Sequence, residues 1–135
     1  MNAMEKVAWA ELLVCVTALA AVGLLVPWLG DRAVGGFGLL GFLGFTVLFL
    51  RRRGNRVITD ERDTEIQRVA TSFGISAAWF TLFLVLTILV VWAGYSHTDA
   101  VPTRILTWLI WISFAVLYGV KGLAAVVLYR RPHAA

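Results

Sequence analysis

Residues 69–94 read VATSFGISAAWFTLFLVLTILVVWAG and contain no Asp, Glu, Lys or Arg. An α-helix needs about 20 mostly apolar residues to cross the hydrocarbon core of a lipid bilayer. A small soluble domain leaves much of its surface in water, so it cannot hide an apolar run of this length. We therefore predict that this segment is a transmembrane helix.

Three other segments of the same kind lie along the chain. They are residues 7–29, 33–50 and 104–129, and the whole chain of 135 residues is 60% hydrophobic, against about 45–50% in soluble domains. The sequence therefore predicts an all-α fold in which residues 1–135 form a single transmembrane domain. We expect a four-helix transmembrane bundle made of two helical hairpins, with the lipid bilayer as its surroundings.

The basic residues are unevenly divided between the two ends of the predicted spans. Arg32 and Arg104 fall at one end, and nine basic residues fall at the other. These nine are Lys6, Arg51, Arg52, Arg53, Arg56, Arg62, Arg68, Arg130 and Arg131. Because Lys and Arg in short loops stay on the cytoplasmic side, we predict that both termini and the loop 51–68 face the cytoplasm (N-in/C-in). The membrane is then the cytoplasmic (inner) membrane of a prokaryote, and the net charge of +4 reflects this topology and no nucleic-acid partner.

The loop between the second and third predicted spans carries a dense group of charges. It contains Asp60-Glu61-Arg62-Asp63 and, three residues later, Ile66. Acidic residues are favoured at the start of a helix, where they cap it and meet the positive end of its dipole. We therefore predict that the third helix begins near Asp60 and extends out of the membrane as a cytoplasmic stem. The charges either lie in water as part of a capped helix start or dock a cytoplasmic regulatory protein.

The run Asp60-Glu61-Arg62-Asp63-x-x-Ile66 directly before a predicted transmembrane helix resembles the signature of a family of small prokaryotic membrane proteins. The likeness covers residues 60–66 and the order of the predicted spans. It implies a chain with four spans and this acidic-Arg motif after the second one. It implies no activity and no cofactor, because none is assigned to that family.

Two charged residues fall inside predicted spans. Glu11 lies one to two turns into the first span, and Lys121 lies at a similar depth in the fourth. A charge at the centre of a span costs about 2.5–3.5 kcal/mol on insertion scales. We predict that the two side chains face each other as an ion pair, although each is also long enough to reach the interface alone. The pair either fixes the first helix beside the fourth, or Glu11 is the proton- or cation-binding carboxylate of a small transporter or channel.

Glycines recur along the second predicted span, at Gly35, Gly36, Gly38, Gly41 and Gly44. Small residues allow helices to pack closely in lipid, either within one molecule or between the copies of a homo-oligomer. Their three-residue spacing differs from Gly-x-x-x-Gly, so in an α-helix the row winds around the surface. We expect no catalytic residue, metal site or cofactor, because His97 and His133 have no partner at catalytic or ligand spacing.

These patterns together predict an integral membrane protein that is not an enzyme. We interpret the charged loop 51–68 as a segment for partner docking or regulation. The alternative is a small proton- or cation-coupled transporter or channel that uses Glu11.

Overall fold

The computed structural model describes residues 3–45, 61–96 and 100–130. Every regular element in these ranges is helical, which confirms the all-α prediction. The elements are α1 (Ala3–Leu29), the 3-10 segment η1 (Gly30–Phe45), α3 (Glu61–Ser96) and α4 (Thr103–Arg130).

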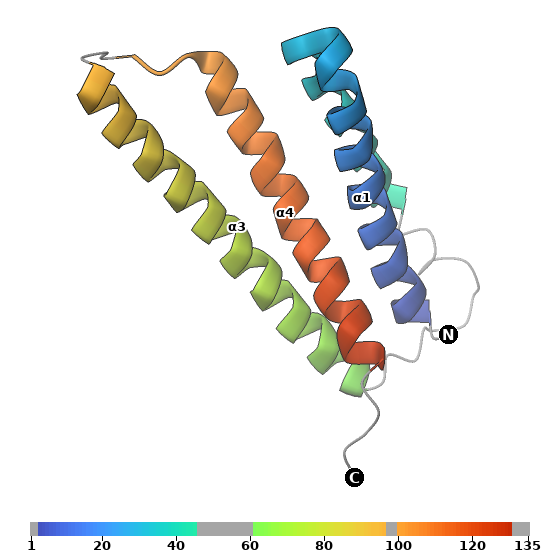
Figure 1. Cartoon of the computed structure of the whole chain (residues 1–135). Coiled ribbons are helices and arrows are strands. Elements are labelled where there is room, and N and C mark those ends of the chain that lie inside the picture. The colour runs from blue at the N-terminus through green and yellow to red at the C-terminus, as the bar shows by residue number, and fades with distance from the viewer. Residues whose placement is uncertain (1–2, 46–60, 97–99, 131–135) are drawn as a thin grey trace.

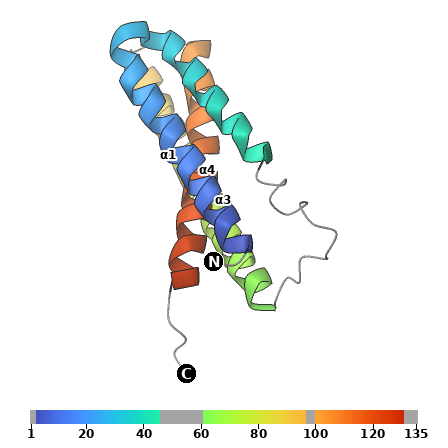
Figure 2. The ribbon, with the colours of Figure 1, turned by 90° about the vertical axis from the view of Figure 1, so that its right-hand side faces the viewer.

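Helix α4 lies between α1 and α3 and packs against both (Figure 1). The first residues of α1, the first residues of α3 and the last residues of α4 lie at the same end of the molecule. At the opposite end, the chain reverses after α1, and η1 returns beside it (Figure 2). Gly30 makes this reversal with a φ of 54°, a left-handed conformation that costs glycine little because it has no Cβ.

The prediction of a four-helix transmembrane bundle is wrong. Among the described residues, three helices are long and apolar enough to cross a membrane, and they cover Met4–Phe45, Glu61–Ser96 and Thr103–Arg130. The first of these takes in η1, so the second predicted span, 33–50, does not form an α-helix of its own. Its residues up to Phe45 are in 3-10 conformation, and its last five residues lie outside the described ranges.

The glycines of this segment give the physical reason for the error. Glycine is about 1 kcal/mol less favourable than alanine in the interior of an α-helix, and five glycines fall within residues 35–44. The sequence prediction counted apolar residues and gave no weight to this loss of α-helix propensity. The apolar character of the segment was predicted correctly, but its backbone conformation was not.

The start of the third helix agrees with the sequence prediction. We expected continuous helix from about Asp60 into the third span, and α3 is continuous from Glu61, the first described residue of this part of the chain, to Ser96. Residues 61–68 of the predicted loop 51–68 are therefore the first two turns of α3. Its remaining part, residues 51–60 with Asp60, lies outside the described residues.

Small residues bring the three helices into backbone contact. A Cβ atom added at Gly74 of α3 would lie 2.5 Å from the carbonyl oxygen of Leu117 in α4. A Cβ atom added at Gly122 of α4 would lie 2.9 Å from the amide nitrogen of Leu12 in α1. Alanine residues complete these contacts, since Ala8 and Ala70 are fully buried. Such close approach is typical of helices that associate in lipid, where small residues let backbones meet.

The contact at Gly74 predicts the effect of a single methyl group. We expect Gly74→Ala to lower stability by about 1–3 kcal/mol, because the new Cβ atom meets backbone that has no room to move. Gly94→Ala is the matched control in the same helix, since a Cβ atom there meets no described atom within 4 Å. This control should be neutral or stabilising by up to about 1 kcal/mol, through helix propensity alone.

The measurement is reversible unfolding of both variants in mixed micelles, followed by circular dichroism. Equal stability of the two variants would contradict the close packing of α3 against α4.

Candidate functional site

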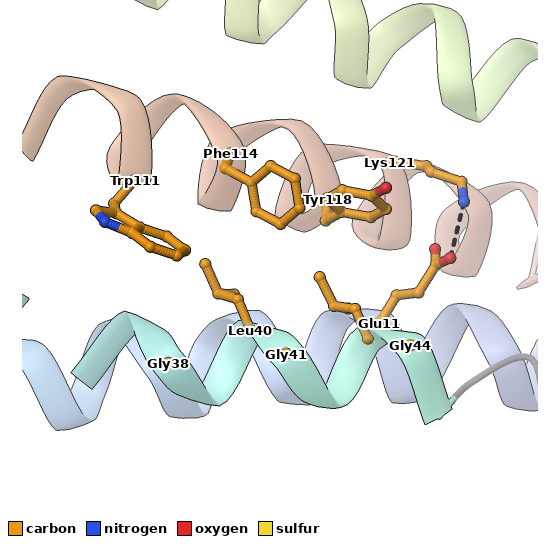
Figure 3. Close-up of a pocket in the computed structure, with 10 residues that line it drawn as sticks. Glu11, Gly38, Leu40, Gly41, Gly44, Trp111, Phe114, Tyr118 and Lys121 are labelled. Carbon is orange, nitrogen blue, oxygen red and sulfur yellow. Dashed lines mark hydrogen bonds and ion pairs between the residues drawn. The ribbon is translucent and has the colours of Figure 1, made fainter. Parts of the chain in front are cut away.

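The structure brings together the two charges whose pairing the sequence predicted. Glu11 lies on α1 and Lys121 on α4, and the Lys121 Nζ atom donates a hydrogen bond of 2.8 Å to Glu11 Oε1 (Figure 3). The side chains are 7% exposed for Glu11 and 17% exposed for Lys121. The ion pair is therefore buried between the two helices.

The local sequence explains why these side chains meet. Gly122 directly follows Lys121 and lets the backbone of α4 touch the backbone of α1 at Leu12, the residue that follows Glu11. Ala8 and Cys15 lie on the same face of α1 as Glu11 and are also buried. Small neighbours on both helices thus leave space for two long charged side chains to reach each other.

A second ion pair joins the opposite end of α4 to the start of η1 and offers a comparison. The Arg104 Nη1 atom lies 2.7 Å from Asp31 Oδ2, with the side chains 62% and 56% exposed. Exposed pairs contribute about 0–1 kcal/mol, since water screens them. Breaking a buried pair costs about 3–5 kcal/mol, because the remaining charge keeps its desolvation penalty. The N–O distances of the two pairs are similar, so their different burial accounts for the different stability that we expect from them.

One oxygen of Glu11 is left without a partner. Glu11 Oε2 is buried and accepts no hydrogen bond from any of the described residues. A buried acceptor without a donor costs about 1–3 kcal/mol. A hydrogen-bond donor supplied by a ligand would remove this cost.

A pocket of about 640 Å³ lies beside the ion pair. Its lining comes from three elements: α1 gives Glu11, η1 gives Gly38, Leu40, Gly41, Leu43 and Gly44, and α4 gives Trp111, Phe114, Tyr118 and Lys121. The three aromatic side chains of α4 point toward η1, and the ion pair stands at one end of the row (Figure 3). The volume of the pocket falls within the range of about 300–1,000 Å³ that is typical of small-molecule sites.

The residues of the Asp60–Ile66 motif have different surroundings. Asp60 lies outside the described residues, whereas Glu61 and Arg62 are exposed. Asp63 is only 3% exposed and Ile66 is 7% exposed. The motif therefore does not act as one charged surface, because part of it belongs to the helix contacts.

Tyr129 of α4 is the partner of Asp63 that the sequence analysis missed. Its hydroxyl group donates a hydrogen bond of 3.0 Å to Asp63 Oδ1. Asp63, Ile66 and Ala70 recur at helical spacing and are all buried, so the periodicity contained a signal for this face. The signal was overlooked because the acidic cluster was explained by helix capping alone.

Metal binding and family membership receive no support from the described part of the chain. No group of three or more His, Cys, Asp or Glu side chains in the described ranges is placed to hold a metal ion. Comparison with models of protein families, with curated proteins and with solved structures finds no match. The resemblance carried by the Asp60–Ile66 motif therefore stays a prediction, and function is argued from the geometry of the site.

The buried pair predicts a non-additive pattern of stability. We expect Glu11→Gln and Lys121→Met each to lower the free energy of unfolding by about 3 kcal/mol or more, because each leaves one charge buried without its counter-ion. The double variant should recover part of this loss. Unfolding of the four proteins in mixed micelles measures the cycle.

Asp31→Asn and Arg104→Met provide the control cycle for an exposed pair. Here we expect losses of no more than about 1 kcal/mol. Additive losses in the Glu11–Lys121 cycle would show that the pair has no coupling energy.

Proposed function

We propose that this chain is a non-enzymatic, multi-pass membrane protein that binds and transports a small solute in the pocket beside Glu11, coupled to a proton or a cation. The observation that carries this proposal is the buried Glu11 Oε2 atom, which lacks a donor among the described residues and belongs to a side chain that lines the pocket. Ionisable side chains within membrane spans are costly and mark ion and substrate pathways.

Competition for one carboxylate would supply the coupling. Glu11 can hold a proton, or it can keep its ion pair with Lys121 through Oε1 and accept a hydrogen bond from a ligand at Oε2, and the protonated and ligand-bound states exclude each other. A ligand that occupies Oε2 excludes a proton from the same atom. Solute binding and proton binding would then be linked, as exchange transport requires.

Lys121 has a second interaction that would support it when the ion pair opens. Its Nζ atom lies 5.7 Å from the ring centroid of Tyr118, within range of a cation–π contact. The aromatic ring faces the same pocket as the carboxylate. An ammonium group that leaves Glu11 therefore keeps part of its stabilisation.

We also propose that the protein lies in the cytoplasmic membrane of a prokaryote with both termini in the cytoplasm. Among the described residues, three helices are long and apolar enough to cross a membrane, and the first of them reverses after α1, so that η1 returns toward the end at which α1 begins. The end of the molecule that holds the first residues of α1 and α3 and the last residues of α4 carries Lys6, Arg62, Arg68 and Arg130. The positive-inside rule assigns that end to the cytoplasm.

Partner docking by the segment 51–68 is the second candidate function. In its described part, four of the five charged side chains at the start of α3 are exposed, namely Glu61, Arg62, Glu65 and Arg68. Exposed charges at this position suit contact with a cytoplasmic regulatory protein. This hypothesis would gain weight if transport measurements failed.

The orientation predicts the activity of reporters in cells. A green fluorescent protein fused after Ala135 should fluoresce, and an alkaline phosphatase inserted at His97 should be active, because the two sites face opposite sides of the membrane. In the control, the two reporters exchange positions, and neither of them should then be active. Cleavage of residues 51–68 by a protease added outside intact cells would overturn the orientation.

The transport function predicts proton movement that depends on Glu11. Proteoliposomes with a trapped pH dye are given three ring compounds in turn: para-propylphenol, para-propylbenzyltrimethylammonium and para-propylbenzenesulfonate. We expect at least one of them to drive a proton flux above that of empty liposomes. Glu11→Gln should abolish this flux, because glutamine cannot exchange a proton, whereas the exposed control Glu61→Gln should retain it. If no compound drives a flux that depends on Glu11, transport of these solute classes is excluded.

A further inference from the structure

The pocket beside Glu11 and Lys121 has features that specify the chemistry of its ligand. This inference rests on the proposed function only in taking that pocket as the ligand site. We infer that the pocket binds an uncharged, lipid-soluble ring compound with a hydroxyl donor, of which a phenol is the simplest example, with the hydroxyl group on Glu11 Oε2 and the ring between η1 and α4.

The first argument is charge balance. Among the described residues, the lining of the pocket contains one carboxylate and one ammonium group, and its other residues are uncharged. These two groups lie 2.8 Å apart and neutralise each other. A charged ligand would add a buried charge without a counter-ion, which is strongly unfavourable away from water. The site therefore favours a ligand without net charge.

The second argument is the vacant acceptor. Glu11 is 5% exposed, and its Oε2 atom has no donor in the described part of the chain. Because this atom is closed off from water, the carboxylate has to turn toward the pocket before a hydroxyl group on the ligand can satisfy it. Hydrogen bonds from O–H donors to carboxylates are short and about twice as strong as neutral ones. A ligand with only acceptor groups gains nothing at this position.

The third argument is the shape of the wall formed by η1. Gly38, Gly41 and Gly44 recur at every third residue, and a 3-10 helix has 3.0 residues per turn, so the three glycines form one straight row. A Cβ atom at any of them would meet no described atom within 4 Å. The row is therefore smooth and has open space in front of it, and the side chains of Leu40 and Leu43 form the rest of this wall.

The fourth argument is the opposite wall. Trp111, Phe114 and Tyr118 share one face of α4 and point toward η1 (Figure 3). Aromatic side chains favour offset-stacked or edge-on contact with another ring. A flat ring that lies along the glycine row and against these aromatic side chains fits the pocket better than a branched aliphatic group.

The experiment measures binding to the full-length protein in nanodiscs by isothermal titration calorimetry. The probe is para-propylphenol, and para-propylanisole is its matched control, in which a methyl group replaces the hydroxyl proton. Empty nanodiscs correct for partitioning into lipid. We expect saturable binding of the phenol, about tenfold or more tighter than that of the anisole, because one charge-assisted hydrogen bond separates them.

Variants of the protein test where the ligand binds. Gly41→Leu should fill the space in front of the glycine row and abolish binding of the phenol. Gly35→Leu is the matched control, because Gly35 belongs to the same row but does not line the pocket. It should leave the affinity within about twofold, a change that corresponds to only a few tenths of a kcal/mol.

Glu11→Gln combined with Lys121→Met removes both charges without leaving either unpaired. This variant should bind the phenol and the anisole with similar affinity. Unfolding measured in parallel separates loss of the site from loss of the fold.

Three outcomes would overturn the inference: equal affinity of the wild-type protein for phenol and anisole, binding that survives Gly41→Leu, or tighter binding of para-propylbenzyltrimethylammonium. A proton flux driven by the charged probes alone would leave the transport function standing and remove this ligand class. Binding of the phenol without any proton flux would support this ligand class and contradict the transport function.

Discussion

The ion pair between Glu11 and Lys121 depends on a backbone contact beside it. Gly122 brings α4 against Leu12 of α1 so closely that even a methyl group would have to displace backbone atoms. Because the two backbones are this close, the charged groups of the two long side chains lie within contact distance. Their burial removes the water that would otherwise solvate them. The pair in turn fixes the rotation of α1 and α4 about their axes, because any other rotation leaves two charges unpaired in an apolar interior.

The conformation of η1 determines what lies opposite this pair. In an α-helix, glycines at every third position drift around the surface, since each step of three residues covers 300° instead of a full turn. In a 3-10 helix the same spacing produces a straight row, and Gly38, Gly41 and Gly44 face the pocket together. Beside this row, Phe37, Leu40 and Leu43 pack into the hydrophobic core with α1 and α4, and Leu40 and Leu43 also line the pocket. The wall that η1 gives to the pocket therefore consists of a smooth glycine row and the leucine side chains beside it.

Simple properties of the sequence were enough to predict the three α-helices and the charge pair. Length and apolar content determine which segments can cross a bilayer, and equal depth with opposite sign predicts that Glu11 and Lys121 meet. The conformation of η1 could not be predicted in this way, because hydropathy is insensitive to how the backbone is coiled. The burial of Asp63 was also missed, since its partner Tyr129 is far along the chain and only the packing of α3 on α4 brings them together.

The polar contacts at the two ends of α4 differ in how far they are buried. Lys121 joins it to α1 and Tyr129 joins it to α3, about two helical turns apart, and both bonds are at least partly buried. The core cluster at this end contains residues of all three α-helices, including Ala8, Ile66 and Ala125. At the other end, Arg104 of α4 pairs with Asp31, and water screens this exposed pair. The pocket extends from Lys121 toward Trp111, so its charged end lies beside the buried polar contacts and its aromatic end lies beside the apolar cluster that contains Phe37. Trp111 stacks on Phe37 with ring centroids 6.2 Å apart, so a buried ion pair defines one end of the site and ring packing defines the other.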